Sequence, residues 1–426
     1  MKFIEQLRRI WKSPDMRRDL LFILGMLTLF RLVAHIPLPG VDVRSLQALL
    51  GGNQFLGLLN VFTGGTISNF SVVALGVGPY ITASIIIQLL TMVLPKLEEL
   101  QKEGEQGQAR INAYTRYLTV PLCFLQGYGI IALLRQSGQG VVLNLSPMTL
   151  ATMLFTMAAG TLFLMWIGEL ISEKKMGNGI SLLIFAGIVA ALPQYLAQTA
   201  AIFDAGQAIT LLAFAVVAAV TIAGVVTVSE GQRNIPVTYA KRVHGMQLAG
   251  GVDTHLPLRV SMAGVIPIIF AISVMLFPPI VAQLFLRAKT VWLAAVAEWT
   301  VRLFQNQLFY SLAYFLLVFG FTFFYTTLIF RPTQIAENLQ KQGGFIPGIR
   351  PGSPTANYLT FVMNRITLAG AVFLAVIAVL PLAMQQYTGS QTMAIGGTSL
   401  LIVVSVVIET VKQIQSQLTM REYETI

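Results

Sequence analysis

The stretch Asn60–Leu94, NVFTGGTISNFSVVALGVGPYITASIIIQLLTMVL, decides the fold of this chain. Its second half is apolar enough to cross a bilayer, whereas its first half is small and polar, with TGGT at residues 63–66. Between the halves, Gly76, Gly78 and Pro79 favour an irregular or kinked backbone. Irregular backbone at membrane depth persists only where protein buries it or where it lines a water-filled cavity. The stretch therefore predicts a pore or a cavity inside a membrane protein.

The composition is that of a protein that crosses a bilayer several times. Of the 426 residues, 55% are hydrophobic and 11% are charged, and the mean hydropathy is +0.72. Soluble domains carry about a quarter charged residues, so an ordinary soluble fold is excluded. The single cysteine, Cys123, cannot form a disulfide framework or a cysteine-based metal site within one chain, and the three histidines lack metal-ligand spacing. We therefore expect no metal and no cofactor.

Ten apolar runs approach the length of about 20 residues that a helix needs to cross a bilayer. Five runs lie on each side of Phe203–Gly206, and inverted five-span repeats are a recurrent transporter plan. The predicted spans are Leu20–Ile36, Val72–Leu94, Tyr117–Leu134, Thr149–Ile171, Ile180–Ala200, Ile209–Val228, Val260–Phe285, Leu308–Phe330, Ile366–Leu382 and Ala394–Val411.

The basic residues predict how the chain is oriented. Net charge is +10, and most of the 28 lysines and arginines lie at the two termini and in alternate connections between spans. Because positive residues collect in cytoplasmic loops, both termini are predicted to be cytoplasmic, with long cytoplasmic loops at 229–258 and 331–364. In the first loop, VTYAKRVHG before Gly245 predicts a short hairpin. Between the seventh and eighth spans, Val291–Asn306 predicts an amphipathic interfacial helix.

Motifs of enzyme chemistry are missing from the sequence. It holds no GxxxxGK[ST] nucleotide loop, no HExxH and no GxSxG. Glu169 and Glu409 lie toward the predicted cytoplasmic ends of their spans, which favours helix-pairing or interfacial roles over a proton relay. Arg31, near the end of the first span, is expected to snorkel outward. What remains is a passage driven by an external energy source. There are two alternatives. One is an inverted-repeat solute transporter, which would need a midplane carboxylate or cation site. The other is an interaction protein without a pore.

Six stretches of the sequence then narrow the choice among these classes of protein. They are ALGVGPYITASIIIQLL (74–90), KEGEQGQARINAYTRY (102–117), FLMWIGELISEKKMGNGISLLIFAGIVAALP (163–193), THLPLRVSMAGVIPIIFA (254–271), GFIPGIRPG (344–352) and GGTSLLIVV (396–404). In these strings the chain closely resembles the SecY family, the channel subunit of the bacterial protein-conducting translocon. The resemblance runs nearly end to end in a single register.

The resemblance implies an all-α fold of ten transmembrane helices. These form two pseudo-symmetric five-helix halves, 1–202 and 203–426, around a central pore. It also implies a gated, non-enzymatic channel that moves unfolded secretory polypeptides across the bacterial plasma (inner) membrane and releases transmembrane segments laterally into lipid. The implied partners are the small subunits SecE and SecG, the motor ATPase SecA, the ribosome, and a preprotein with its signal sequence.

The resemblance also assigns four groups of site residues. The pore ring, whose branched apolar side chains would exclude water by dewetting, is Val77, Ile81, Ile180, Ile184, Ile269 and Ile402. The plug, at about residues 60–71, includes Asn60, Thr63, Gly64, Gly65, Thr66, Ser68 and Asn69. The lateral gate includes Ser84, Gln88, Asn178 and Phe277. The docking site for the motor or the ribosome includes Lys241, Arg242 and Arg350, while Met246 stands where the family often has a basic residue.

Overall fold

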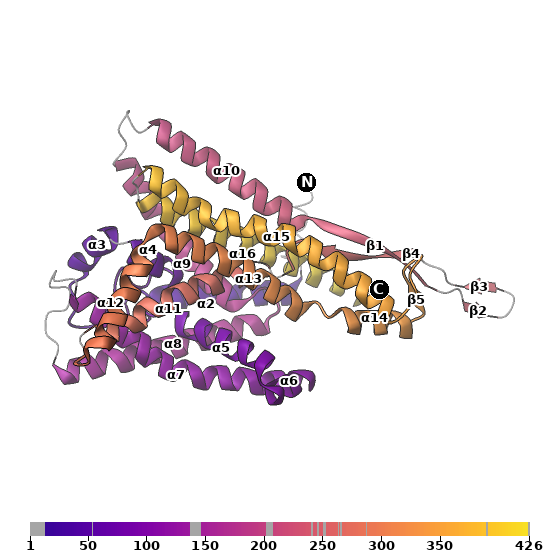
Figure 1. Ribbon diagram of the computed structural model, residues 1–426, viewed down its shortest axis with the longest axis horizontal. Helices are drawn as coiled ribbons and strands as arrows, with labels where there is room; N and C mark the ends of the chain where they lie inside the picture. Colours follow the sequence, from indigo (N-terminus) through magenta and orange to yellow (C-terminus); the bar gives the residue numbers. More distant parts are fainter. Residues whose placement is uncertain are drawn as a thin grey trace.

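In the computed structural model, most of the chain forms helices that pack into a membrane bundle (Figure 1). The described residues are 13–52, 54–136, 146–201, 208–239, 242–244, 247–249, 253–262, 264, 266–286, 288–388 and 391–424. The expected boundary between the halves, at 202 and 203, lies outside these residues.

Each of the ten expected spans overlaps one helix. The helices are α2 (Pro14–Val33), α5 (Gly78–Val93), α7 (Glu105–Gln136), α8 (Pro147–Glu173), α9 (Gly179–Ala201), α10 (Ala208–Glu230), α11 (Ile266–Phe285), α13 (Gln307–Ile329), α15 (Ser353–Thr388) and α16 (Gln391–Glu424). Within the described residues, however, only 6 helices are long and apolar enough to cross a membrane by themselves. A seventh results if α5 is joined to α6 (Pro95–Lys102), which is bent from it by 100°. The expected count of ten is thus not reached on length and hydropathy alone.

The helices that fall short do so for visible reasons. The described apolar stretches of α9 and α10, Gly179–Pro193 and Ala215–Glu230, are only 10–17 residues long. Helix α2 carries Arg17, Arg18 and Asp19 near its start and Arg31 in its last turn, so every stretch of it that is long enough to span a membrane contains several charged residues. Short or partly charged spans are tolerated where tilt and burial among neighbouring helices compensate.

The opening stretch is broken as its glycines and proline predict. Helices α3 (Val43–Gly52) and α4 (Gln54–Phe62) are followed by turns over residues 63–77. Helix α5 starts only at Gly78, six residues after the predicted start of the span, because Pro79 in its first turn favours initiation there. Within the expected plug only residues 60–62, the end of α4, are helical, and residues 63–71 form turns.

A small sheet joins the two long loops at one end of the bundle (Figure 1). Strand β1 (Gln232–Tyr239) pairs antiparallel with β4 (Asp253–Arg259) and with β5 (Gly344–Phe345). Strands β2 (Arg242–His244) and β3 (Gln247–Ala249) form the predicted hairpin. Helix α14 (Pro332–Lys341) occupies the second loop, which ends at Gly352 and not at Asn364 because α15 begins at Ser353. The sheet ties the two loops into one unit.

Ion pairs join neighbouring helices near their ends. Lys174 of α8 pairs with Asp19 of α2 at 3.3 Å. Arg116 of α7 pairs with Glu169 of α8 at 2.8 Å, which confirms the helix-pairing role expected of that carboxylate. Lys412 of α16 pairs with Glu230 of α10 at 2.9 Å. In the part of the chain that the structure describes, every ion pair links residues within 1–202 or within 203–426.

Candidate functional site

The predicted plug, residues 60–71 and called the plug segment below, is folded onto itself by its polar side chains. Thr63 donates through Oγ1 to the Asn60 carbonyl at 3.1 Å, and Thr66 donates to the Thr63 carbonyl at 3.1 Å. The Asn60 side chain accepts from the Ser68 amide at 2.9 Å, and Ser68 Oγ donates to the Gly65 carbonyl at 2.7 Å. Asn60, Thr63 and Thr66 are buried. Because their polar groups are satisfied internally, the segment can be buried among apolar helices.

The Gly64–Gly65 turn docks against α9 with its bare backbone. A Cβ atom added to Gly187 of α9 would lie 2.2 Å from the Cα of Gly64. Gly64 has φ +76, in the left-handed region that favours glycine. On the other side, Arg31 Nη1 donates to the Gly64 carbonyl at 3.3 Å. The expectation that Arg31 only snorkels outward is therefore wrong: its half-buried guanidinium contacts the plug segment.

Helix α4, which leads into the plug segment, packs against helices from both halves of the sequence. It contacts α9, α11 and α16. Helix α3 before it also contacts α16. At the start of α3, Asp42 accepts hydrogen bonds from the Ser45 hydroxyl at 2.7 Å and the Arg44 amide at 3.1 Å, and these bonds hold its pKa below the ordinary value. Helices α3 and α4 thus lie at the end of the bundle opposite the strands (Figure 1).

The predicted ring residues lie in the core beside this segment. Five of them share one continuous cluster of buried side chains and are between 1% and 4% exposed: Val77, Ile81, Ile184, Ile269 and Ile402. Ile180 differs, because it is half-buried and its Cδ1 lies 2.5 Å from where Gly168 of α8 would carry a Cβ. Its observed contact is thus with the neighbouring helix α8. The ring positions on α9, α11 and α16 belong to the same three helices that α4 contacts.

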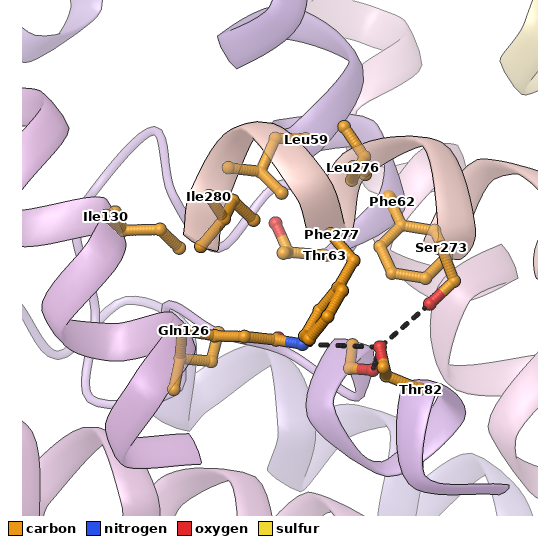
Figure 2. Close-up of a pocket in the computed structure, with 12 residues that line it drawn as sticks. Leu59, Phe62, Thr63, Thr82, Gln126, Ile130, Ser273, Leu276, Phe277 and Ile280 are labelled. Atoms are coloured by element: carbon orange, nitrogen blue, oxygen red, sulfur yellow. Dashed lines mark hydrogen bonds between the residues drawn. The ribbon is translucent and has the colours of Figure 1, made fainter. Parts of the chain in front are cut away.

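A polar layer crosses the seam where α5 and α7 meet α11 (Figure 2). The hydroxyls of Thr82 on α5 and Ser273 on α11 are hydrogen-bonded at 3.0 Å, and Gln126 of α7 donates to Thr82 at 3.3 Å. These residues border a cavity of about 20 Å³, which is room for a single water molecule. Phe62 and Thr63 from the plug side also line it. The cavity therefore joins the plug to the seam.

The seam extends from α11 to the neighbouring helix α13 through a hydrogen bond to α5, and α7 approaches α11 closely through its backbone. Tyr325 of α13 donates through its hydroxyl to Gln88 Oε1 of α5 at 2.5 Å. Gln88 in turn donates to Ser84 at 2.9 Å. On α7, Gly129 faces α11 so closely that an added Cβ would lie 2.8 Å from the Ile280 carbonyl oxygen. The seam is thus held by a few hydrogen bonds and by contacts that only glycine permits.

Two of the four predicted gate residues lie directly at this seam. Gln88 bridges α5 and α13, and Phe277 lines the polar cavity (Figure 2). Ser84 joins only through Gln88, within its own helix. Asn178 caps the start of α9, where its side chain accepts from the amides of Ile180 and Ser181 at 3.1 and 3.3 Å. Sequence reasoning missed Thr82, Gln126, Ser273 and Tyr325, although a polar residue in each of these apolar helices was an available signal.

Two of the three predicted docking residues, Arg242 and Arg350, lie at the end of the bundle that carries the sheet. Arg350 is exposed in a turn between Gly348 and Gly352, whose φ values are +82 and +92. Its carbonyl accepts from the Thr355 hydroxyl at 2.8 Å, which holds the turn against the start of α15. Arg242 begins strand β2, and Lys241 lies outside the described residues.

The structure thus has apolar helices of membrane-spanning length that surround a self-bonded polar segment, with a cluster of buried apolar side chains beside that segment. This arrangement is that of a membrane channel. The family model for SecY matches residues 71–411. The chain belongs to the SecY family.

Named relatives agree over almost the whole length. The chain is 45% identical over 430 residues to the protein translocase subunit SecY of Streptomyces galbus, with 98% of each chain covered. It is 44% identical over 442 residues to the subunit of the same name from Mycobacterium bovis, with 99% of this chain and 98% of the relative covered.

Solved structures show the same fold. One described as the structure of a protein conducting channel superimposes with a TM-score of 0.63 at 17% identity, covering 93% of this chain and 91% of the other. Sec61 in the canine ribosome-channel complex from the endoplasmic reticulum gives a TM-score of 0.60 at 17% identity over the same shares.

Proposed function

We propose that the chain is the channel subunit of a bacterial protein translocase. It conducts unfolded secretory polypeptides across the plasma membrane and releases apolar segments sideways into lipid. One observation carries the proposal: α4, which leads directly into the plug segment, is packed between α9, α11 and α16. A polar segment with satisfied hydrogen bonds at this depth is a removable stopper, because it does not depend on its surroundings for hydrogen-bond partners.

In this proposal the two halves, 1–202 and 203–426, separate to open the pore. The ion pairs at the helix ends hold each half as a unit, whereas hydrogen bonds and apolar contacts join one half to the other. Hydrogen bonds between membrane helices contribute about 0.6–2 kcal/mol each. The Thr82–Ser273 and Gln88–Tyr325 bonds are therefore weak enough for an entering signal sequence to part them.

The ring residues form the seal of the proposed pore. Branched apolar side chains exclude water and ions by dewetting, and they offer no polar group that could hold a passing chain. Crosslinking from the ring positions to a secretory chain stalled in transit tests the proposed function most directly. Crosslinks from Ile81, Ile184 and Ile402 are expected, and a chain that crosslinks to none of them would refute a central pore.

Energy and assembly come from partners in this proposal. SecA or the ribosome docks on the cytoplasmic loops around the sheet, and SecE and SecG complete the complex. Both termini then lie in the cytoplasm together with the sheet. The turn at Gly348–Gly352 presents the Arg350 guanidinium, whose planar fork suits carboxylate or phosphate groups of a docking partner.

The variant Ile402→Asn is expected to raise the resting ion conductance of the purified channel. Ile402 is 1% exposed within the core beside the plug segment, so an amide there brings water into the seal. Conductance across planar bilayers is the measurement. The matched control is Val407→Asn, since Val407 on the same helix is exposed. Equal conductance of the Ile402→Asn and control channels would contradict a place for Ile402 in the seal.

The variant Arg350→Glu is expected to block motor-driven translocation into reconstituted vesicles while the complex still assembles. The reversed charge repels the acidic or phosphate surface that the guanidinium is proposed to bind. The control is Lys341→Glu at the end of α14, which makes the same charge change at a second exposed position of this loop. If the Arg350→Glu channel translocates at the rate of the unmodified channel, Arg350 is not part of the docking site.

A further inference from the structure

We propose that α12 (Val291–Gln305) binds the lipid headgroup region of the bilayer through one apolar face formed by Trp292, Val296 and Trp299. All three side chains are more than half exposed. The inference rests on the membrane fold and does not depend on the proposed transport function.

The helix has three distinct faces. At roughly 100° per residue, Trp292, Val296 and Trp299 fall within about 60° of arc. Ala297 is buried and marks the face that packs on the bundle. Glu298 and Arg302 form an exposed ion pair at 2.6 Å on the remaining side. A helix with a buried face, a tryptophan face and a charged face suits the boundary between lipid and water, where tryptophan rings are enriched.

The tryptophan face continues a surface that must touch lipid. Helix α13, one of the membrane-spanning helices, exposes a stripe formed by Leu308, Leu312 and Leu316. Asn306 alone separates the two helices, and its side chain caps α13 by accepting from the Leu308 and Phe309 amides at 3.0 and 3.2 Å. The Phe304 and Phe309 rings pack edge to face at 5.5 Å across this corner. The orientation of α12 relative to the lipid-facing stripe is therefore set by the fold.

This arrangement gives α12 a mechanical role. It contacts both α11 and α13, and α11 carries Ser273 and Phe277 of the seam. An anchor at the lipid surface would hold the adjoining ends of these two helices at one depth while they move sideways. The partner is thus the bilayer interface itself, and not a second protein surface.

Tryptophan quenching in vesicles tests the proposal, because the chain has only 4 tryptophans. The full chain that keeps Trp299 alone (Trp11→Phe, Trp166→Phe, Trp292→Phe) is reconstituted in phosphatidylcholine–phosphatidylglycerol vesicles with lipids brominated either near the headgroup or deep in the acyl chain. We expect headgroup-proximal bromine to quench about twice as strongly as deep bromine, and aqueous iodide to quench weakly. A variant that keeps only Trp166, which is exposed on membrane-spanning α8, controls for reconstitution and lipid contact.

Three outcomes would overturn the assignment. Quenching by iodide without quenching by bromolipid would put the face in water. Stronger quenching by deep bromine would put it within the hydrocarbon core. Little quenching by either agent, while the Trp166 control responds to bromolipid, would show that protein covers the face, either a second copy or another subunit.

Discussion

Cysteines introduced at Thr82 and Ser273 are expected to form a disulfide on oxidation and to reduce translocation about tenfold or more. The two hydroxyl oxygens are 3.0 Å apart across the seam, so two sulfur atoms in their places need only a small shift to reach the bonding distance. A covalent link between α5 and α11 prevents the seam from parting. Export of a fluorescent preprotein into vesicles, before and after addition of reductant, measures the effect.

The background for this experiment is Cys123→Ala, since the native thiol is buried in α7, which is itself one of the seam helices. Each single-cysteine variant, treated with the same oxidant, is the matched control and should transport normally. Reductant should restore transport in the double variant. A disulfide that forms fully while transport continues at the normal rate would show that α5 and α11 need not separate.

The variant Gly187→Ala is expected to open the resting channel and to raise its ion conductance about tenfold. Alanine normally favours a helix over glycine, so α9 itself should become more stable. Its methyl group would, however, lie 2.2 Å from the Cα of Gly64, and the plug segment must move away. Overpacking of this kind costs about 1–3 kcal/mol, and 1.4 kcal/mol already shifts an equilibrium tenfold. Conductance across planar bilayers is the measurement.

The matched control is Gly320→Ala on α13, where an added Cβ meets nothing within 4 Å. That variant should conduct like the unmodified channel. The complex formed by each variant is examined by size-exclusion chromatography, so that a loss of folding is distinguished from an open channel. If Gly187→Ala assembles and stays closed, then the backbone contact between Gly64 and Gly187 does not hold the plug.

Much of the fold could be predicted from local patterns. Apolar runs of about span length located a helix for each of the ten segments, because a bilayer requires that length and that polarity of the residues themselves. Gly76 and Pro79 likewise marked the break before α5. The hairpin β2–β3 followed from alternation in the loop. The start of α15 was placed too late, since its first turns are polar and hydropathy counted them as loop.

The site was predictable only in part, because its contacts join distant segments. Thr82 and Ser273 are separated by 191 positions in the chain, and Gln88 and Tyr325 by 237. A polar residue within an apolar helix marks such a position as a candidate, but its own segment does not reveal which distant residue it pairs with. Arg31 illustrates the same limit: its position near a helix end suggested snorkelling, whereas the folded chain brings the Gly64 carbonyl to it.

The sequence by itself determined that this chain is a helical membrane protein whose second span is preceded by a broken, polar segment, and six stretches of its sequence pointed to the family. These properties depend on residue type and spacing, because the hydrophobicity of a segment and the freedom of its backbone act directly on its local structure. Only the tertiary structure decided that Gly64 rests on Gly187 and that Thr82 faces Ser273. Such pairs arise from the packing of whole helices against one another, and no single segment contains the information about its partner.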